Sequence, residues 1–271
     1  MKQLKDKVII ITGASSGIGK ALATQAIKNE MKVVMAARNI EAMETLLDEV
    51  SCDRQKVLVV KTDVAVEAEC KALVDKTISH FGHIDMLVNN AGISMRALFE
   101  GINLDVIRQL MDINFWGTVY CSYYALPWLL KSKGSLVGIS SIAGYKGLPA
   151  RTGYSASKFA MHGLLESIRI ENLKKGLHVL IACPGFTTSN IRKVALVSDG
   201  SRQGESPRNE DKMMSAEEVA THLFAAITKR KRTLVLSRQG KLTVLLSKFL
   251  PALTDKLVYN HMAKEADSPF K

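Results

Sequence analysis

Short apolar segments alternate along the chain with longer amphipathic ones. The apolar segments are rich in β-branched residues and lie at residues 7–12, 32–37, 56–62, 84–88, 135–140, 178–183 and 233–236. Between them, apolar positions recur with helical spacing up to about residue 29, over residues 41–50, 67–81, 104–131 and 152–174, and after the capping-box sequence SAEE at residue 215. The alternation predicts strands that are each followed by a helix.

The predicted strands are apolar throughout, rather than at every second position. Such strands are expected where helices cover both faces of a parallel sheet. Right-handed crossovers then give an α/β fold: a three-layer doubly wound parallel sheet of the Rossmann type, with about seven strands in the order 3-2-1-4-5-6-7. We expect a single domain over residues 1–271, because no repeat of fixed period and no long linker interrupts the pattern.

Two segments stand apart from this alternation. Residues 198–212, SDGSRQGESPRNEDK, are polar and contain glycine and proline. They fall within residues 186–214, which we interpret as a substrate loop or lid, with a plain surface loop as the alternative. Residues 238–266 intersperse lysines among apolar positions and predict a C-terminal amphipathic helical extension.

Composition favours a soluble globular protein. The 271 residues are 47% hydrophobic and 23% charged, and no apolar run approaches the ~18 residues of a membrane span. The N-terminal sequence MKQLKDKVIIITG leads into a glycine motif without a cleavage site, so we expect no signal peptide and a cytoplasmic location. Four cysteines without CxxC spacing are expected to be reduced packing residues, and six histidines without HxxxH spacing predict no metal site.

The formal net charge of +11 indicates an anionic partner. Basic residues are partly concentrated at residues 229–232, but no aromatic-interleaved basic surface or helix-turn-helix pattern accompanies them, so we expect no nucleic-acid partner. The C-terminal amphipathic stretch suits a subunit contact in a homodimer or homotetramer, or peripheral contact with an anionic membrane.

A glycine-rich turn follows the first predicted strand. The sequence TGASSGIGKALA, residues 12–23, spaces its glycines as GxxxGxG at the start of a helix. Glycine lets the backbone approach a pyrophosphate, and a helix N-terminus offers it N–H groups and partial positive charge. The strand before the turn and the helix after it distinguish it from a plain glycine-rich turn. We therefore expect dinucleotide contacts at Gly13, Ser15, Ser16, Gly17, Ile18 and Gly19.

The end of the second strand predicts which dinucleotide binds. Sheets that bind NAD place an acidic side chain there, whereas this chain has Ala37 followed by Arg38. A guanidinium can bind the 2′-phosphate that a carboxylate would repel, so we predict NADP(H); a solvated Arg38 is the alternative. Asp63, with Val64 beside it, ends the third strand and is placed to reach the adenine, or equally to cap the next helix.

Tyr154 and Lys158, in YSASK, are the candidates for proton transfer. Positions i and i+4 of a helix lie on one face, so the phenol and the ammonium can share a site. A nearby cation favours the phenolate, so we expect Lys158 to lower the pKa of Tyr154 from about 10. The spacing alone is more often accidental, but Ser141, 13 residues before Tyr154, and the glycine turn favour the functional interpretation.

Taken in order, the motifs resemble those of the short-chain dehydrogenase/reductase family. They are TGASSGIG at residues 12–19, NNAG at 89–92, Asn114, Ser141 in ISSIAG, YSASK at 154–158 and PG at 184–185, and the resemblance covers about residues 5–195. It implies a catalytic tetrad of Asn114, Ser141, Tyr154 and Lys158. The implied reaction is reversible hydride transfer between NADP(H) and a carbonyl compound or alcohol.

The resemblance also implies individual roles. Ser141 would polarise the substrate oxygen, Lys158 would bond the nicotinamide ribose, and Asn114 would hold a proton-relaying water, with backbone capping by Asn114 as the alternative. Asn90 would hold the sheet near the cofactor, with sheet architecture alone as the alternative. Further cofactor contacts are implied at Ala91, Gly92, Pro184, Gly185, Thr187 and Ser189. The family often has a threonine where this chain has Ser189, so which of Thr187, Thr188 and Ser189 contacts the carboxamide stays open.

The substrate site is expected in the loops after the strands, at residues 94–97, 142–151 and 186–197. Their apolar side chains predict a small apolar carbonyl or alcohol of lipid, steroid or retinoid type, unless they pack on the core; they are Ile142, Tyr145, Leu148, Phe186, Ile191 and Leu196. The sequence TSNIRKVAL and the C-terminal part resemble the branch of the family that contains dehydrogenase/reductase SDR family member seven and, more distantly, the 11-beta-hydroxysteroid dehydrogenases.

Overall fold

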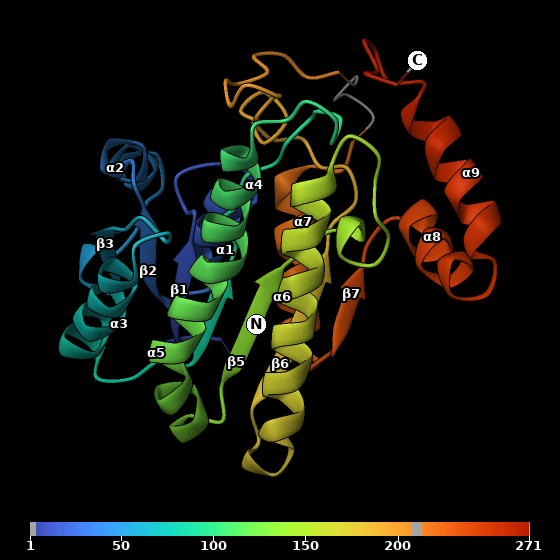
Figure 1. Ribbon diagram of the computed structural model, residues 1–271. Coiled ribbons are helices and arrows are strands. Elements are labelled where there is room, and N and C mark those ends of the chain that lie inside the picture. The colour runs from blue at the N-terminus through green and yellow to red at the C-terminus, as the bar shows by residue number, and fades with distance from the viewer. Residues whose placement is uncertain (1–3, 208–212, 271) are drawn as a thin grey trace.

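A parallel sheet with helices on both faces forms the centre of the molecule (Figure 1). The computed structural model describes residues 4–207 and 213–270. Within them, seven strands lie in the order β3-β2-β1-β4-β5-β6-β7, which confirms the predicted fold class and order. The strands are β1 (Val8–Thr12), β2 (Lys32–Ala37), β3 (Val57–Lys61), β4 (Met86–Asn89), β5 (Ser135–Ile139), β6 (His178–Cys183) and β7 (Thr233–Val235).

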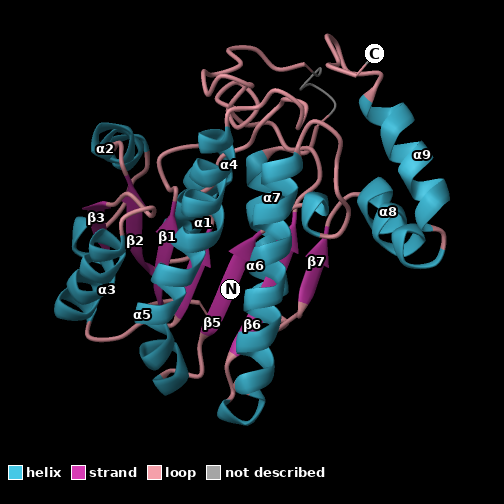
Figure 2. Cartoon of the chain, viewed as in Figure 1, coloured by secondary structure: helices cyan, strands magenta, loops and turns pink. Residues whose placement is uncertain are grey.

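The helices form one layer on each face of the sheet (Figure 2). Successive residues of a strand point to opposite faces, so Ile9 and Ile11 enter one core and Ile10 enters the other. The first core is completed by α1 (Gly17–Lys28), α2 (Ile40–Glu49) and α7 (Ala216–Thr228), and the second by α3 (Glu67–Phe81), α5 (Gly117–Lys131) and α6 (Thr152–Glu171). Short 3₁₀ segments are η1 (Arg54–Lys56), η3 (Ile142–Gly144) and η4 (Leu173–Lys175).

The predicted helix over residues 104–131 is continuous but not uniform. α4 (Leu104–Leu110) passes through a π-helical stretch, η2 (Met111–Trp116), into α5. Such stretches replace regular helical hydrogen bonds and are frequent at functional sites. This one carries Asn114, whose side chain is wholly buried.

The predicted C-terminal helical stretch is divided into two helices, α8 (Arg238–Phe249) and α9 (Pro251–Met262). Pro251 has no N–H to continue α8 and instead occupies the first turn of α9. The two helices pack against each other beyond the β7 edge of the sheet (Figure 1). Among the helices in the described parts of the chain, none is long and apolar enough to cross a bilayer.

The carboxyl ends of the strands, and the loops that follow them, meet at one edge of the sheet (Figure 1). Residues 186–207 lie along this edge, where Leu196 bridges to Met95 and Thr187 bridges to Met214. Of the predicted lid, residues 208–212 lie outside the described residues. The predicted capping box is confirmed, because Ser215 Oγ accepts from Glu218 N at 3.1 Å and Ser215 N donates to Glu218 Oε2 at 2.8 Å.

Candidate active site

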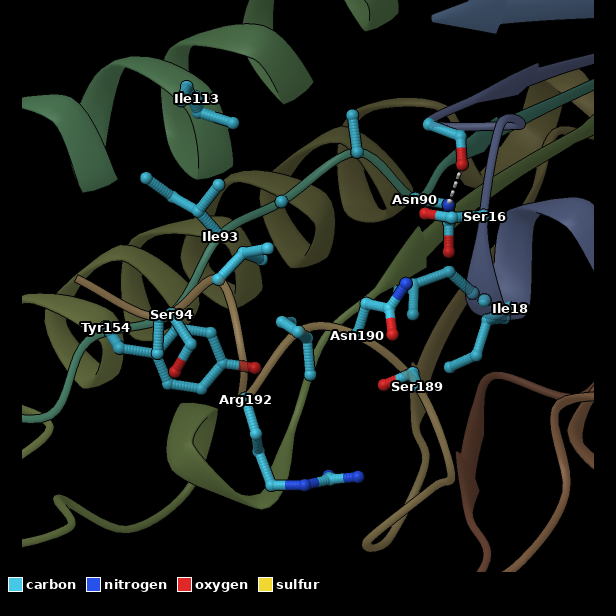
Figure 3. A pocket seen from close by; sticks show the side chains of 18 of the residues that line it. Ser16, Ile18, Asn90, Ile93, Ser94, Ile113, Tyr154, Ser189, Asn190 and Arg192 are labelled. Carbon is cyan, nitrogen blue, oxygen red and sulfur yellow. Dashed lines mark hydrogen bonds between the residues drawn. The ribbon is translucent and has the colours of Figure 1, made fainter. Parts of the chain in front are cut away.

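A cavity of about 690 Å³ opens among the loops at the carboxyl edge of the sheet. Figure 3 shows Ser16, Ile18 and Ser189 toward one end and Tyr154 and Ser94 toward the other. The predicted site residues that line it are Gly13, Ser15, Ser16, Gly17, Ile18, Arg38, Asp63, Val64, Asn90, Ala91, Gly92, Ser141, Tyr154, Lys158, Pro184, Gly185, Thr187 and Ser189. Gly19 and Asn114 are not among the lining residues, although the sequence predicted both as site residues.

At Gly13 and Gly19, the glycine turn leaves no room for a side chain. Gly13 has φ +66°, and a Cβ there would lie 2.9 Å from Ala91 Cα. A Cβ on Gly19 would lie 2.1 Å from Gly13 O, so Gly19 packs α1 against the turn instead of facing the cavity. Ser16 precedes α1 without a side-chain cap, and the first turn of α1 holds no acidic residue. Uncapped N–H groups without a competing carboxylate make this end of the cavity suited to an anion.

Asn90 joins the ends of β1 and β4 (Figure 3). Its Nδ2 donates to Thr12 O at 2.8 Å and to Gly13 O at 3.3 Å. Thr12 Oγ1 accepts from the backbone N–H groups of Asn90 and Ala91, each at 3.0 Å. These bonds are architectural, and they hold the glycine turn at the mouth of the cavity.

Arg38 and Asp63 lie together at the ends of the neighbouring strands β2 and β3. Arg38 Nη1 is 3.9 Å from Asp63 Oδ2, and the Arg38 side chain is 63% exposed. Asp63 Oδ1 accepts from Ala65 N at 3.0 Å, so it also stabilises the turn that leads to α3. Ala37 leaves no acid at the end of β2 itself. The guanidinium therefore lies at this end of the cavity, and among the described residues its ion pair with Asp63 is a long one.

Asn114 is held by three side-chain hydrogen bonds. Its Oδ1 accepts from Ile93 N at 2.8 Å, and its Nδ2 donates to Ile93 O at 3.0 Å and to Ser157 Oγ at 2.9 Å. Both amide hydrogens are thus used to fix the loop after β4 against α6. A Cβ on Gly92 would lie 3.0 Å from Asn114 Oδ1 and 3.6 Å from Lys158 Nζ, so this glycine keeps a narrow space beside the lysine.

Lys158 and Tyr154 lie on the same face of α6 but are not hydrogen-bonded to each other. Lys158 Nζ donates to Ile139 O at 2.9 Å and lies 5.7 Å from the centroid of the Tyr154 ring. The lysine is 4% exposed, and burial lowers its pKa to about 8. Ser141 makes a side-chain hydrogen bond to Tyr154.

The predicted lowering of the Tyr154 pKa is wrong for this structure. Burial raises the pKa of the phenol above its ordinary value, and the Ser141 hydrogen bond and the charge of Arg151 only partly oppose that rise. Lys158 does not act as predicted because its ammonium is directed at the Ile139 carbonyl and is itself destabilised by burial. Tyr154 is therefore a protonated phenol at neutral pH.

Four of the six apolar residues predicted for the substrate walls line the cavity. Leu148, Phe186, Ile191 and Leu196 line the cavity, whereas Ile142 and Tyr145 do not. Tyr145 instead packs edge-on against His162, with ring centroids 4.5 Å apart. Of the three hydroxyl residues after Pro184–Gly185, Thr187 and Ser189 line the cavity and Thr188 does not.

Sequence reasoning missed Gln109 and Met262, which line the cavity but lie outside the predicted substrate loops and lid. Arg151, Arg192, Arg202 and Gln203 lie within those predicted segments, although their side chains were not singled out. Arg151 had a usable signal, since it stands three residues before Tyr154, at the start of the same helix. Met262 carries no local signal, because only the tertiary fold brings the end of α9 to this edge.

The described residues contain no cluster of histidine, cysteine and acidic side chains suited to a metal ion. All four cysteines are free, as predicted. His162 is a buried packing residue: its Nε2 lies 2.6 Å from Ser140 Oγ, and burial together with the charge of Lys158 lowers its pKa to about 4.

Comparison with known proteins defines the class. The short chain dehydrogenase family model matches residues 7–197, so the chain belongs to the short-chain dehydrogenase/reductase family and is an oxidoreductase of that class. Among its relatives is mouse (Mus musculus) dehydrogenase/reductase SDR family member 7B, 33% identical over 98% of this chain and 84% of the relative. The 11-beta-hydroxysteroid dehydrogenase-like 2 protein of Arabidopsis thaliana is 39% identical over 68% of this chain and 60% of that protein.

Solved structures of the family share the fold. A short-chain dehydrogenase/reductase from Burkholderia phymatum, in complex with NAD, superposes with a TM-score of 0.81. It is 25% identical, and the superposition covers 93% of this chain and 96% of that chain. This member of the family was thus solved with a nicotinamide cofactor bound.

The depressed pKa of Lys158 predicts a pH-dependent stability. Between pH 8 and 10.5 the unfolded chain keeps a proton that the folded lysine has released, so this residue makes folding more favourable as pH rises through that window. Without cofactor, the free energy of unfolding of wild type relative to Lys158→Met should rise by up to about 3 kcal/mol across it, measured by urea denaturation. Lys71→Met controls for the loss of an exposed lysine. A constant difference between wild type and Lys158→Met would contradict the prediction.

Proposed function

We propose that the protein catalyses reversible hydride transfer between NADP(H) and a carbonyl compound or secondary alcohol. The observation that carries the proposal is the joint placement of Ser141, Tyr154 and Lys158 in one cavity with an uncapped glycine turn. A dinucleotide needs both: an anion-binding helix N-terminus for its pyrophosphate and a proton donor beside its reactive ring.

The residues present fit such a cofactor. The Cβ-free surface at Gly13 and the exposed N-terminus of α1 accept a diphosphate, and Thr187 and Ser189 offer hydroxyl groups farther along the same cavity. When bound, the nicotinamide supplies the hydride or accepts it. The chain's own side chains hold the substrate oxygen and move the proton.

In the proposed reaction, Tyr154 is the general acid and base at the substrate oxygen. In reduction, its hydroxyl proton moves to that oxygen as the carbonyl gains a hydride; in oxidation, the proton returns to the phenolate. Ser141, whose side chain lies near enough to Tyr154 to lower the pKa of the phenol, would hold the same oxygen. Lys158, with a pKa of about 8, can resupply the proton near neutral pH, and Asn114 holds the loop that forms the space beside it. Burial raises the pKa of Tyr154, so the hydroxyl keeps the proton that reduction requires.

Arg38 supports NADP(H) rather than NAD(H). Its exposed guanidinium, 3.9 Å from Asp63, is available for charge-assisted bonds to a 2′-phosphate, and no acid ends β2. The Burkholderia phymatum relative was solved with NAD. For this chain, Arg38 is the feature that supports a preference for NADP(H).

For the substrate, we propose a hydrophobic carbonyl compound or alcohol of lipid, steroid or retinoid type. Leu148, Phe186, Ile191 and Leu196 supply apolar walls, and relatives carry the name of 11-beta-hydroxysteroid dehydrogenases. Gln109 and Arg151 add polar groups to the same cavity, which suits a substrate with a second oxygen function.

The α8–α9 hairpin, residues 238–262, is proposed as the contact surface of a cytoplasmic protein. Leu242, Leu245 and Phe249 recur at helical spacing on α8 and are each more than half exposed. Lys241 and Lys248 are exposed on the same helix. An apolar stripe beside lysines fits a second copy in a homodimer or homotetramer, or an anionic membrane surface.

Replacing Tyr154 by phenylalanine should lower kcat for NADPH-dependent carbonyl reduction about 10²- to 10⁴-fold, because the proton donor is lost. NADPH binding, followed by the change in cofactor fluorescence, should be nearly unchanged. Tyr145→Phe is the matched control, since Tyr145 is close to the site but does not line the cavity. Full activity of Tyr154→Phe would refute the mechanism.

Arg38→Ala should weaken NADPH binding about tenfold or more, because charge-assisted bonds to the 2′-phosphate are lost. NADH binding should change little, because NADH lacks that phosphate. Both dissociation constants are measured by cofactor fluorescence. Arg54→Ala, an exposed arginine paired with Glu44 and Asp48 in the same half of the molecule, is the control. Equal losses of affinity for NADPH and NADH would contradict the proposed preference for NADP(H).

Leu245→Glu and Phe249→Glu should abolish the association that the hairpin mediates, because each places a charge in the apolar stripe. Light scattering measures the oligomeric state, and flotation with phosphatidylserine vesicles measures membrane binding. Leu173→Glu, an exposed leucine in η4, is the control. A wild-type monomer that does not float would show that the hairpin has neither role.

A further inference from the structure

The segment after α9 folds back to the rim of the cavity. Met262, the last residue of α9, is 4% exposed and lines the cavity. Glu265 N donates to Met262 O at 3.1 Å, and the hydroxyl of Tyr259 donates to Phe270 O at 3.1 Å. Residues 262–268, called here the C-terminal wall, are therefore an ordered part of the carboxyl edge of the sheet.

The wall is held by a buried carboxylate between two arginines. Glu265 is 6% exposed, and its Oε2 lies 3.5 Å from Arg96 Nε and 3.7 Å from Arg151 Nη2. Arg96 also donates through Nη2 to Ala266 O. The two arginine side chains are themselves 10% and 11% exposed. An unpaired charge in such a place would be costly, so each member of this cluster depends on the others.

Both arginines belong to segments that shape the substrate end of the cavity. Arg96 follows β4, and its N–H donates to Leu196 O at 2.8 Å, in the predicted substrate loop. Arg151 lines the cavity and directly precedes α6, three residues before Tyr154. The loop that contains Arg96 also contacts the loop that ends at Arg151, because Ala97 N donates to Ala150 O at 3.2 Å. Glu265 thus connects the C-terminal wall to both sides of the opening above Tyr154.

We propose that the C-terminal wall closes the substrate end of the cavity, and that Glu265 is the positioning residue that holds it there. Met262 then limits the size of the carbonyl compound that reaches Tyr154. This inference rests on the proposed function and deepens it, because it assigns size selection to a segment about a hundred residues away from the catalytic helix in sequence.

The test compares Glu265→Gln with Met262→Ala, and uses Asp255→Asn as the matched control. Asp255 forms a second ion pair from α9, to Lys146, but neither residue lines the cavity. Steady-state rates are measured with NADPH and two aldehydes of different bulk, benzaldehyde and 1-naphthaldehyde. Thermal unfolding identifies variants that have lost the fold, and Met262→Ala carries the test if Glu265→Gln does not fold.

Met262→Ala and Glu265→Gln should each raise the ratio of kcat/KM for 1-naphthaldehyde to that for benzaldehyde about five- to tenfold, mainly through KM. The KM for NADPH should stay within about twofold, and Asp255→Asn should leave the ratio unchanged. Amide hydrogen exchange at residues 262–268 should become faster in Glu265→Gln than in Asp255→Asn. A purely structural role for Glu265 would lower the melting temperature without changing the ratio.

The outcomes separate this inference from the function on which it rests. If the wild-type protein reduces either aldehyde and the ratio is unchanged in both Met262→Ala and Glu265→Gln, the wall does not select substrates, although the proposed function stands. If the wild-type protein consumes no NADPH with these aldehydes or with a panel of ketones, the proposed function fails and the inference fails with it.

Discussion

The close contact between the glycine turn after β1 and the chain after β4 is the constraint on which the site depends. A side chain at Gly13 would collide with the backbone of Ala91, and Thr12 and Asn90 bind each other across the same junction. This contact sets where α1 begins, and hence where its free N–H groups point. It also fixes the chain that continues through Gly92 to Ile93, which Asn114 in turn binds to α6. The glycine turn and the residues around Tyr154, proposed to bind phosphate and to transfer the proton, are therefore parts of one junction.

Local patterns were sufficient to predict most of this arrangement. The strands are apolar on both faces, so their number and parallel direction followed from periodicity, and their order followed from the typical doubly wound arrangement. The glycine turn and the Tyr154–Lys158 pair are each contained in a few consecutive residues. Their predicted positions in one cavity agree with the structure because parallel strands bring all their following loops to one edge.

What the sequence could not predict depends on side-chain direction and on distant packing. Ile142 and Tyr145 are as apolar as Leu148, yet they turn away from the cavity, Tyr145 against His162 and Ile142 against the start of α8. Met262 and Glu265 reach the site only because α8 and α9 form a hairpin broken at Pro251. No short-range pattern marks such residues, since their neighbours in space lie more than a hundred residues away in sequence.

Burial shifts the pKa values of Tyr154 and Lys158, both on α6, in opposite directions. It raises the pKa of Tyr154 and lowers that of Lys158 to about 8, because each loses the hydration of its charged form. Burial thus makes phenolate and ammonium each less favourable than in water, although a lysine with a pKa of about 8 is still mostly protonated at pH 7. A phenol that holds its proton is a poor base but a usable acid, and a lysine near pKa 8 exchanges protons readily at neutral pH. In the proposed reaction, an oxidised nicotinamide would add a positive charge to the cavity and would favour the phenolate that oxidation requires. Tyr154 would still accept or donate the proton, and Lys158 would still exchange it with solvent.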